Sequence, residues 1–410
     1  MNSNNLLYEF QSGFRQTFST DTALTSLSDR VRLNMDDGLY TGVVLIDLQK
    51  AFDTVNHQIL TTKLKSIGMD NTVVSWFQSY LSDRQQFVSV NGRVSAYGRV
   101  TCGVPQGSIL GPLLFTLYVN DMIQAVTCDL FLYADDSALV VSGTDPRQIE
   151  ITLAENLKSL SYWLEENKLS LHLGKTESIL FATKKKLSKC NRLNIMCNDK
   201  EIESKSSIKY LGVTFDQDFS GLSMASLMLK KINAKLKFLY RNNMYFGFKE
   251  RKLLVSTLVQ SNFDYGVNSW FRGLPQNVKT KFQTTQNRLI RYILNYDGRH
   301  HLCSEDFKLV GWLNVKDRIE YLSLCLMYKI HIKKAPAYLC DVKLVSHSYN
   351  TRKKELSYIV PKVKSHGQKT FKYCSIKYWN SLPLPIRKSN CLVSFKSKCK
   401  KYYMDHFIKE

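Results

Sequence analysis

Residues 130–141, LFLYADDSALVV, form two short apolar runs on either side of Asp135 and Asp136. Apolar runs of this length, interrupted by a tight polar turn, are typical of two paired strands. An earlier apolar and β-branched run, residues 41–46, is followed directly by Asp47. The sequence therefore predicts a sheet in which one turn carries two carboxylates and a further strand ends on a third.

Helical patterns alternate with these strands, so we expect an α+β fold in which helices pack on one face of an antiparallel sheet. The clearest helix opens at Asp145-Pro146, a capping residue followed by a first-turn proline, and continues with leucines at helical spacing. The other expected elements are helices over residues 20–36, 56–67 and 109–123, a hairpin turn at Asn91-Gly92, a glycine-rich loop over residues 98–108, and one strand over residues 208–215.

Three carboxylates at neighbouring strand ends would repel one another, and cations between them would relieve that repulsion. Hard oxygen ligands from few side chains suit Mg²⁺, which keeps water and substrate phosphates as its other ligands. Two such ions can activate a hydroxyl and stabilise a leaving group in phosphoryl transfer. Taken singly, Asp135-Asp136 is more often an ordinary turn and Asp47 a cap, so the chemistry depends on all three meeting.

The net charge of +22 is divided unevenly along the chain. Residues 1–180 contain 13 Lys and Arg and 19 Asp and Glu, whereas the remaining residues contain 44 and 16. A basic surface of this size usually meets a polyanion, most commonly nucleic acid. A solvated basic face is the alternative, but it leaves the acidic half without an explanation.

The composition excludes several classes of protein. With 44% apolar residues the chain can bury a sizeable core, and no run of about 18 or more uncharged apolar residues predicts a membrane span. The start of the chain lacks the basic and apolar regions of a signal peptide. None of the ten cysteines has CxxC or zinc-finger spacing, so we expect buried free thiols and an intracellular protein, with nucleus or cytoplasm undecided.

Six segments in order resemble the motifs of LINE-type, jockey-like reverse transcriptases of non-LTR retrotransposons. Each match alone is weak, whereas six in order over residues 11–213 are very specific. The matching segments are Gln11-Ser12-Gly13-Phe14-Arg15, residues 44–55 (VLIDLQKAFDTV), residues 103–112 (GVPQGSILGP), Tyr133-Ala134-Asp135-Asp136, Leu173-Gly174-Lys175-Thr176 and Lys209-Tyr210-Leu211-Gly212-Val213.

The resemblance implies an RNA-directed DNA polymerase that copies an RNA template from a DNA primer with dNTPs as substrates. Asp47 and Asp135 would hold two Mg²⁺ ions, with Mn²⁺ as a possible substitute, and Asp136 would support them. Lys175 would lie near the pyrophosphate as a proton donor; its alternative is a surface lysine.

The resemblance also implies binding roles for other residues. Phe52 would lie under the sugar of the incoming nucleotide and exclude a 2′-hydroxyl, and Arg15 would reach the triphosphate; a core phenylalanine and a surface arginine are the alternatives. The remaining positions are Gln106, Gly107 and Tyr133 for nucleotide and template, and Tyr210, Leu211 and Gly212 for the primer.

In this family the fold is a right-handed polymerase with palm, fingers and thumb. We expect partial fingers and a palm over residues 1–216, a basic helical thumb over residues 217–300 and a basic C-terminal extension over residues 301–410. The chain starts ten residues before Gln11, so the finger segment that precedes this motif in the family is expected to be missing. Neither an endonuclease, an RNase H nor a zinc knuckle is expected.

Two other functions remain open. One is a catalytically dead, nucleic-acid-binding remnant of a mobile element, which would bind RNA but not incorporate dNTPs. The other is a helical scaffold that binds no nucleic acid, which the uneven charge argues against.

Trp379, in the segment YWNSLP, is expected in the core rather than on a base-stacking surface. The oligomeric state is not predicted.

Overall fold

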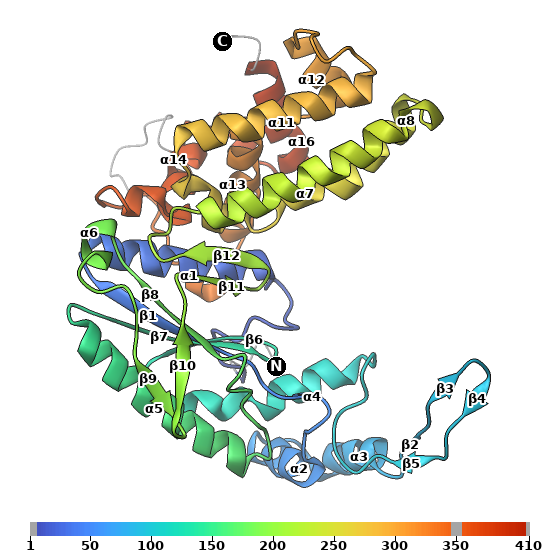
Figure 1. Cartoon of the computed structure of the whole chain (residues 1–410), viewed down its shortest axis with the longest axis vertical. Coiled ribbons are helices and arrows are strands. Elements are labelled where there is room, and N and C mark those ends of the chain that lie inside the picture. Colours follow the sequence, from blue (N-terminus) through green and yellow to red (C-terminus); the bar gives the residue numbers. More distant parts are fainter. Residues whose placement is uncertain (1–5, 346–354, 407–410) are drawn as a thin grey trace. The chain divides into compact units, whose positions relative to one another are not determined.

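The computed structural model describes residues 6–345 and 355–406 of the chain. The chain divides into two compact units (Figure 1). The first comprises Met1–Ser19, Tyr40–Leu180 and Cys190–Ser206, and the second comprises Thr20–Leu39, Phe181–Lys189 and Ser207–Glu410. These units differ from the expected three-part division at residues 216 and 300, because an N-terminal helix belongs to the second unit and that unit continues past both boundaries.

The first unit is built on a six-stranded sheet with the strand order β6-β7-β1-β8-β10-β9. The strands are β1 (Tyr40–Ile46), β6 (Asp129–Tyr133), β7 (Asp136–Gly143), β8 (Glu177–Phe181), β9 (Ile195–Cys197) and β10 (Lys200–Ser204). The α+β class is confirmed, but the expected antiparallel sheet is wrong in one respect. Strand β10 pairs parallel to β8, because the intervening chain crosses over before β10 begins, and the sheet is therefore mixed.

Helix α5 (Pro146–Glu166) covers this sheet, as its leucine stripe predicts. Asp145 caps its first turn by accepting a hydrogen bond from the backbone N–H of Arg147. The leucines of the stripe are all buried: Leu153, Leu157, Leu160 and Leu164. At Gly42 of β1 a Cβ atom would lie 2.4 Å from Ile149, so only glycine allows the helix to pack this closely.

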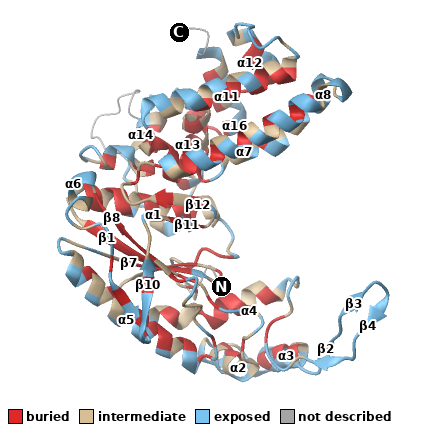
Figure 2. Ribbon diagram, in the orientation of Figure 1, coloured by how far each residue is buried: buried red, intermediate tan, exposed pale blue. Residues whose placement is uncertain are grey.

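The other helices of the first unit are α2 (His57–Ser66), α3 (Asn71–Leu81), α4 (Leu110–Tyr118) and the 3-10 helix η2 (Asn120–Ala125). The expected apolar helix over residues 109–123 is thus shorter as an α-helix and continues as 3-10 turns. Between α3 and α4 the chain forms an exposed arm of two short ladders, β2 (Gln85–Gln86) with β5 (Gly98–Arg99), and β3 (Ser89–Val90) with β4 (Arg93–Val94) (Figure 2). Its tip is the predicted Asn91-Gly92 turn, where both residues have positive φ.

The second unit contains one hairpin, formed by β11 (Ser207–Tyr210) and β12 (Val213–Asp216). The expectation of a single strand over residues 208–215 is wrong. Leu211 and Gly212 both have positive φ, which reverses the chain between two short strands. The apolar residues on both sides of the turn hide it, because leucine is not a usual turn residue.

Helices make up most of the second unit, as the basic and amphipathic pattern predicts. The α-helices are α1 (Thr20–Asp36), α6 (Lys184–Leu187), α7 (Leu222–Arg241), α8 (Phe248–Val255), α9 (Ser261–Asp264), α10 (Val267–Trp270), α11 (Gln276–Leu294), α12 (Ser304–Val310), α13 (Val315–His331), α14 (Phe371–Ser381), α15 (Leu384–Arg387) and α16 (Leu392–His406). In the described part of the last hundred residues, one isolated bridge joins Leu344 and Tyr358.

Two carboxylates of α1 hold the C-terminal residues within the second unit. Asp29 accepts hydrogen bonds from the backbone N–H groups of Phe371 and Lys372, at 2.6 and 2.9 Å. Asp36 accepts from the N–H groups of Lys364 and His366. The first of these pairs lies at the start of α14, where helix N–H groups lack partners within the helix. The C-terminal extension is therefore integrated with α1.

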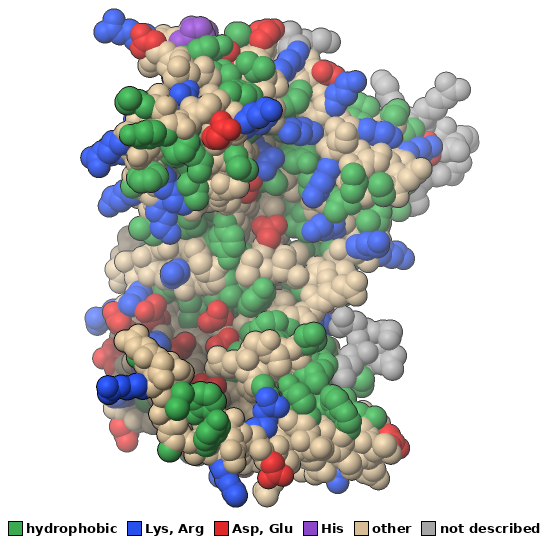
Figure 3. All heavy atoms as spheres, turned by 90° about the vertical axis from the view of Figure 1, so that its right-hand side faces the viewer, with side chains coloured by type: hydrophobic (Ala, Val, Ile, Leu, Met, Phe, Trp, Pro, Cys, Tyr) green, Lys and Arg blue, Asp and Glu red, His purple; other side chains and the backbone are tan. Residues whose placement is uncertain are grey.

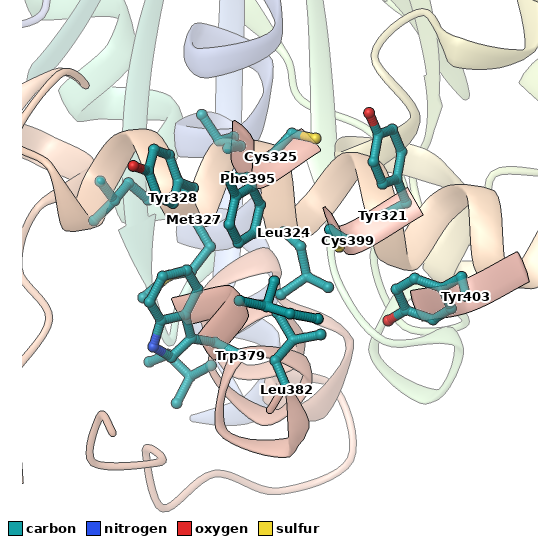
Figure 4. Close-up of a cluster of buried hydrophobic side chains, with 14 of the residues drawn as sticks. Tyr321, Leu324, Cys325, Met327, Tyr328, Trp379, Leu382, Phe395, Cys399 and Tyr403 are labelled. Carbon is teal, nitrogen blue, oxygen red and sulfur yellow. The ribbon is translucent and has the colours of Figure 1, made fainter. Parts of the chain in front are cut away.

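Helices α13, α14 and α16 enclose a buried cluster of apolar and aromatic side chains (Figure 4). Trp379 is fully buried there, and its indole N–H donates to the carbonyl of Leu356 at 2.8 Å. Tyr328 stacks on Phe395 with ring centroids 4.4 Å apart. This confirms the prediction of a core tryptophan.

All ten cysteines are free thiols, as expected, but the expectation of burial is only partly right. Cys197, Cys325 and Cys399 are buried, whereas Cys102, Cys303 and Cys391 are exposed.

Within the described residues, every helix is too short or too polar to cross a membrane.

Candidate active site

The register of the sheet brings the three predicted carboxylates to one edge of the first unit. Strand β1 pairs antiparallel with β7, and Ile46 lies opposite Ser137. Asp47, the next residue after β1, therefore lies beside the turn between β6 and β7. That turn carries Asp135 and Asp136, with Tyr133 paired to Asp136 across it.

The turn has a demanding backbone conformation, which the N-terminal segment supports. Ala134 has a φ of 58°, in the left-handed region that alanine rarely adopts. The buried side chain of Gln11 accepts hydrogen bonds from the N–H groups of Ala134 and Gly13, at 3.2 and 2.9 Å. A Cβ atom on Gly13 would lie 2.4 Å from the nitrogen of Ala134, so the segment packs directly against the turn.

The carboxylates influence one another electrostatically. Desolvation, followed by the negative charges of Asp135 and Asp47, raises the pKa of the Asp136 carboxyl, although the residue as a whole is exposed. The Nζ of Lys175 lies 3.4 Å from Oδ2 of Asp47, and the two side chains are 64% and 37% exposed. The site thus concentrates negative charge that a single exposed ammonium group offsets only in part.

Chemically, this set of donors fits a magnesium ion. All three side chains offer hard carboxylate oxygens, which Mg²⁺ takes together with water and phosphate oxygens. Within the described ranges, no group of three or more His, Cys, Asp or Glu side chains is arranged to hold a metal ion by itself. An ion here would therefore take some of its ligands from water or a bound substrate.

The segment after Asp47 joins the glycine-rich loop. Backbone N–H groups of Gly103 and Val104 donate to the carbonyls of Val55 and Phe52, each at 2.8 Å. Phe52 stacks on the buried ring of Phe115 with centroids 4.4 Å apart, and it is itself partly exposed. The stack on Phe115 therefore holds the ring of Phe52 in one orientation.

The same loop presents Gln106 and Gly107 to solvent. The amide of Gln106 donates to Oδ1 of Asp53 at 2.7 Å. Gly107 has a φ of 79° and open space around the position of a Cβ atom, so its conformation rather than crowding favours glycine. Both residues lie on the loop that binds the Phe52 segment.

Arg15 follows the segment that supports the acidic turn. Its guanidinium donates to the carbonyls of Tyr8 and Gln11, at 2.7 and 3.0 Å, and lies 4.1 Å from the ring centroid of Phe18. These contacts hold the side chain against its own segment. At least two of its N–H donors are therefore engaged in hydrogen bonds to nearby backbone carbonyls.

The predicted primer residues belong to the second unit. Tyr210 is buried at the end of β11, and Leu211 and Gly212 form the hairpin turn. The hydroxyl of Tyr265 donates to the carbonyl of Leu211 at 2.6 Å, and its ring lies 3.2 Å from the position of a Cβ atom on Gly212. Glycine at this position allows the tyrosine to close over the turn.

Three residues support these motifs without having been assigned a role from the sequence. Gln11 holds the acidic turn, Asp53 binds Gln106, and Tyr265 covers the hairpin turn. Gln11 and Asp53 lie inside segments that match the family's motifs, and that position was the available signal. Tyr265 lies 54 positions from Leu211, and no local pattern links them.

The chain belongs to the reverse transcriptase (RNA-dependent DNA polymerase) family, whose model matches residues 1–215. Its curated relatives place it with the reverse transcriptases of non-LTR retrotransposons. It is 29% identical, over 72% of its length, to the probable RNA-directed DNA polymerase from transposon BS of Drosophila melanogaster, of which it covers 33%. It is 28% identical, over 51% of its length, to the RNA-directed DNA polymerase from mobile element jockey of the same species, of which it covers 23%.

The chain thus spans about a third or less of the length of these relatives. Among solved structures, a telomerase from Candida albicans in complex with a fragment of telomeric RNA matches 74% of the chain at 13% identity. The match covers 52% of that chain, with a TM-score of 0.36. At that score the likeness carries no further conclusion.

Proposed function

We propose that this chain catalyses RNA-templated DNA synthesis by attack of a primer 3′-hydroxyl on the α-phosphate of a dNTP. The observation that carries the proposal is the register that sets Asp47 beside the Asp135-Asp136 turn. In this proposal the six-stranded sheet is the palm, the neighbouring helices and arm form partial fingers, and α7 with its neighbours forms the thumb.

Asp47 and Asp135 would hold two Mg²⁺ ions, or Mn²⁺ in their place, and Asp136 would support them. Such ions, when bound, lower the pKa of the attacking hydroxyl and stabilise the negative charge that develops on the leaving pyrophosphate. The raised pKa of Asp136 supports this assignment, because a proton and a cation compete for the same concentrated negative charge.

Nucleotide selection would rest on residues around the carboxylates. Phe52, held by its stack on Phe115, would exclude a ribose 2′-hydroxyl by its bulk. Gln106 and Gly107 would contact nucleotide and template, and Tyr133 would border the nucleotide. Lys175, next to Asp47, would place an ammonium proton near the departing pyrophosphate.

Template and primer would bind the basic second unit. Lys and Arg side chains are spread over its face in Figure 3. One face of α7 is basic and the other buried, which suits contact with a duplex backbone. Tyr210, Leu211 and Gly212, in the rigid hairpin turn, would contact the primer. RNA, primer and dNTPs meet inside cells, and we propose an intracellular location on that ground.

One observation favours a second function, a nucleic-acid binder without polymerase activity. Arg15, the residue assigned to the triphosphate, donates to two backbone carbonyls of its own segment. A guanidinium held in this way has fewer donors for phosphate oxygens. Weak dNTP binding with intact RNA binding would be the result.

Primer extension on poly(rA)/oligo(dT) with Mg²⁺ or Mn²⁺ separates the two functions. We expect extension by the wild type, and a loss of about 10³-fold or more in Asp135→Asn, since one carboxylate ligand is removed. Asp83→Asn is the matched control, because Asp83 is an exposed aspartate of the same unit that lies outside the acidic turn.

If neither the wild type nor the control extends the primer while RNA binding stays sensitive to salt, the nucleic-acid binder is the correct function. Equal extension by the wild type and by Asp135→Asn contradicts the assignment of the catalytic carboxylates.

A further inference from the structure

The second unit contains a cavity of ≈ 570 Å³ whose lining includes five basic residues and one acidic residue. Five segments far apart in the sequence form it: helix α1, the start of α6, residues 218–222, residues 273–275, and residues 366–369 of the C-terminal extension. Its basic residues are Arg32, Lys184, Lys185, His366 and Lys369, and its acidic residue is Asp218. None of them belongs to the site described above.

Arg32 gives this cavity a buried positive charge. The side chain is 2% exposed, and one of its nitrogens donates a long hydrogen bond of 3.4 Å to the carbonyl of Phe219. Burial lowers the pKa of Arg32 to about 10, so the guanidinium remains charged at neutral pH. The guanidinium carbon also lies 4.9 Å from the ring centroid of Phe219. A buried charge that is not paired with a carboxylate is costly, and an anion would relieve that cost.

The acidic groups near Arg32 are already engaged. Asp29 raises the pKa of Arg32 through its charge, but both of its oxygens accept backbone hydrogen bonds from Phe371 and Lys372. Asp218 accepts from the N–H of Ser220 and lies 3.6 Å from Lys184. Among the described residues, no ion pair joins Arg32 to a carboxylate.

The remaining basic groups add to the excess of positive charge. Desolvation and the charge of Arg32 lower the pKa of Lys369, although Asp218 opposes this shift. Desolvation, then the charges of Lys369 and Arg32, lower the pKa of His366. These side chains therefore face one another closely enough to repel.

The wall of the cavity is kept open by a glycine. A Cβ atom on Gly273 would lie 2.4 Å from the carbonyl oxygen of Phe219 and 3.0 Å from a guanidinium nitrogen of Arg32. A larger residue would push Arg32 away from its position. Lys184 and Lys185 are exposed at the rim, and Lys184 lies 3.6 Å from Asp218.

We propose that this cavity is a phosphate-binding site that takes a backbone phosphate of single-stranded RNA or DNA, outside the polymerase site. A guanidinium at the wall and several ammonium groups at the rim match the oxygens of a phosphodiester. Because His366 and Lys369 come from the C-terminal extension, this site gives that extension a part in holding nucleic acid. The proposal concerns binding alone and does not require polymerase activity.

Two double variants of equal charge test the site in the full-length chain. Lys185→Gln/Lys369→Gln removes two exposed lysines of the cavity, neither of which forms an ion pair in the described structure. Lys398→Gln/Lys401→Gln removes two exposed lysines of α16, which lie outside it. Binding of a fluorescent 20-nucleotide RNA is measured by anisotropy over a range of salt concentrations.

We expect the cavity variant to bind RNA about 5- to 10-fold more weakly than the α16 variant, with a smaller salt dependence, since each lost phosphate contact lowers the slope by about 0.7 for single strands. Thermal unfolding with and without pyrophosphate identifies the source of the phosphate. If only the stabilisation by pyrophosphate is lost, while both variants bind RNA equally, the site takes free phosphates. Equal RNA binding and equal stabilisation by pyrophosphate in both variants would overturn the proposal.

Discussion

The two aspartates of the acidic turn in the first unit lack hydrogen-bond donors among the described residues, whereas Asp29 and Asp36 of α1 in the second unit bind backbone N–H groups. Asp135 and Asp136 accept no hydrogen bond from the described residues, but Asp29 accepts two. Desolvation acts to raise the pKa of Asp36, yet N–H groups of Gly367, Lys364 and His366 lower it overall. In contrast, the pKa of Asp136 is raised. Aspartate side chains therefore stabilise the second unit through hydrogen bonds, whereas those of the acidic turn in the first unit remain available to bind a ligand.

The largest expected difference concerns Asp135→Asn. Primer extension should fall about 10³-fold or more, while the thermal midpoint should stay the same or rise, since removing one of several repelling carboxylates relieves strain in the turn. Differential scanning fluorimetry beside the extension assay checks both. A clear fall in the thermal midpoint would mean that Asp135 stabilises the fold. That result would contradict the contrast between the aspartates of the two units.

The opposite result is expected for Asp29→Ala in the second unit. The N–H groups of Phe371 and Lys372 lose their acceptor, which should lower the free energy of unfolding by about 2–4 kcal/mol. Urea denaturation measures the loss, and Asp37→Ala, at an exposed aspartate just after the end of α1, is the control. Equal stability of the two variants would show that α1 does not hold the C-terminal extension.

Gly13→Ala tests whether the N-terminal segment holds the acidic turn. The added methyl group would lie 2.4 Å from the nitrogen of Ala134 and force the turn to move. Because a displacement of about 1 Å can cost about 100-fold in rate, we expect extension to fall about 10- to 100-fold. Gly98→Ala is the control, since a Cβ atom there meets no atom closer than 3.8 Å. Similar extension rates for both variants would show that the N-terminal segment does not position the acidic turn for catalysis.

The smallest expected effect is on the pH profile. The raised pKa of Asp136 means that its carboxyl takes up a proton at a higher pH than an ordinary aspartate, so activity should decline as pH falls through that value. Cations compete with protons, and a tenfold rise in Mg²⁺ should move this acid limb to lower pH by several tenths of a unit. Rates at two Mg²⁺ concentrations test this. An acid limb that does not move would exclude Asp136 from the cation site.

Local patterns predicted strands β1, β6 and β7 and the acidic turn well, because each of them is encoded in fewer than ten consecutive residues. The capped helix α5 and the Asn91-Gly92 turn were predictable for the same reason. The interior tryptophan was also predictable, from its size and apolar character. In these regions sequence neighbours are also structural neighbours.

Contacts between distant segments were not predictable in this way. The Gln11 bond to Ala134 spans 123 positions, and the Asp29 bond to Phe371 spans 342. No periodicity reports such pairings, so the support of the turn and the place of α1 in the second unit were missed. The turn at Leu211-Gly212 was missed for a local reason, since leucine with a positive φ departs from usual turn chemistry.

Direct measurement of cation binding tests the central claim that the carboxylates of the first unit form a divalent cation site. Mn²⁺ would be titrated, with electron paramagnetic resonance detection, into the chain bound to a chain-terminated primer on an RNA template and the next dNTP. Wild type and Asp83→Asn should bind Mn²⁺ alike, whereas Asp135→Asn should lose at least one ion or bind about tenfold more weakly. Identical binding by all three proteins would contradict the assignment of these carboxylates to the metal ions.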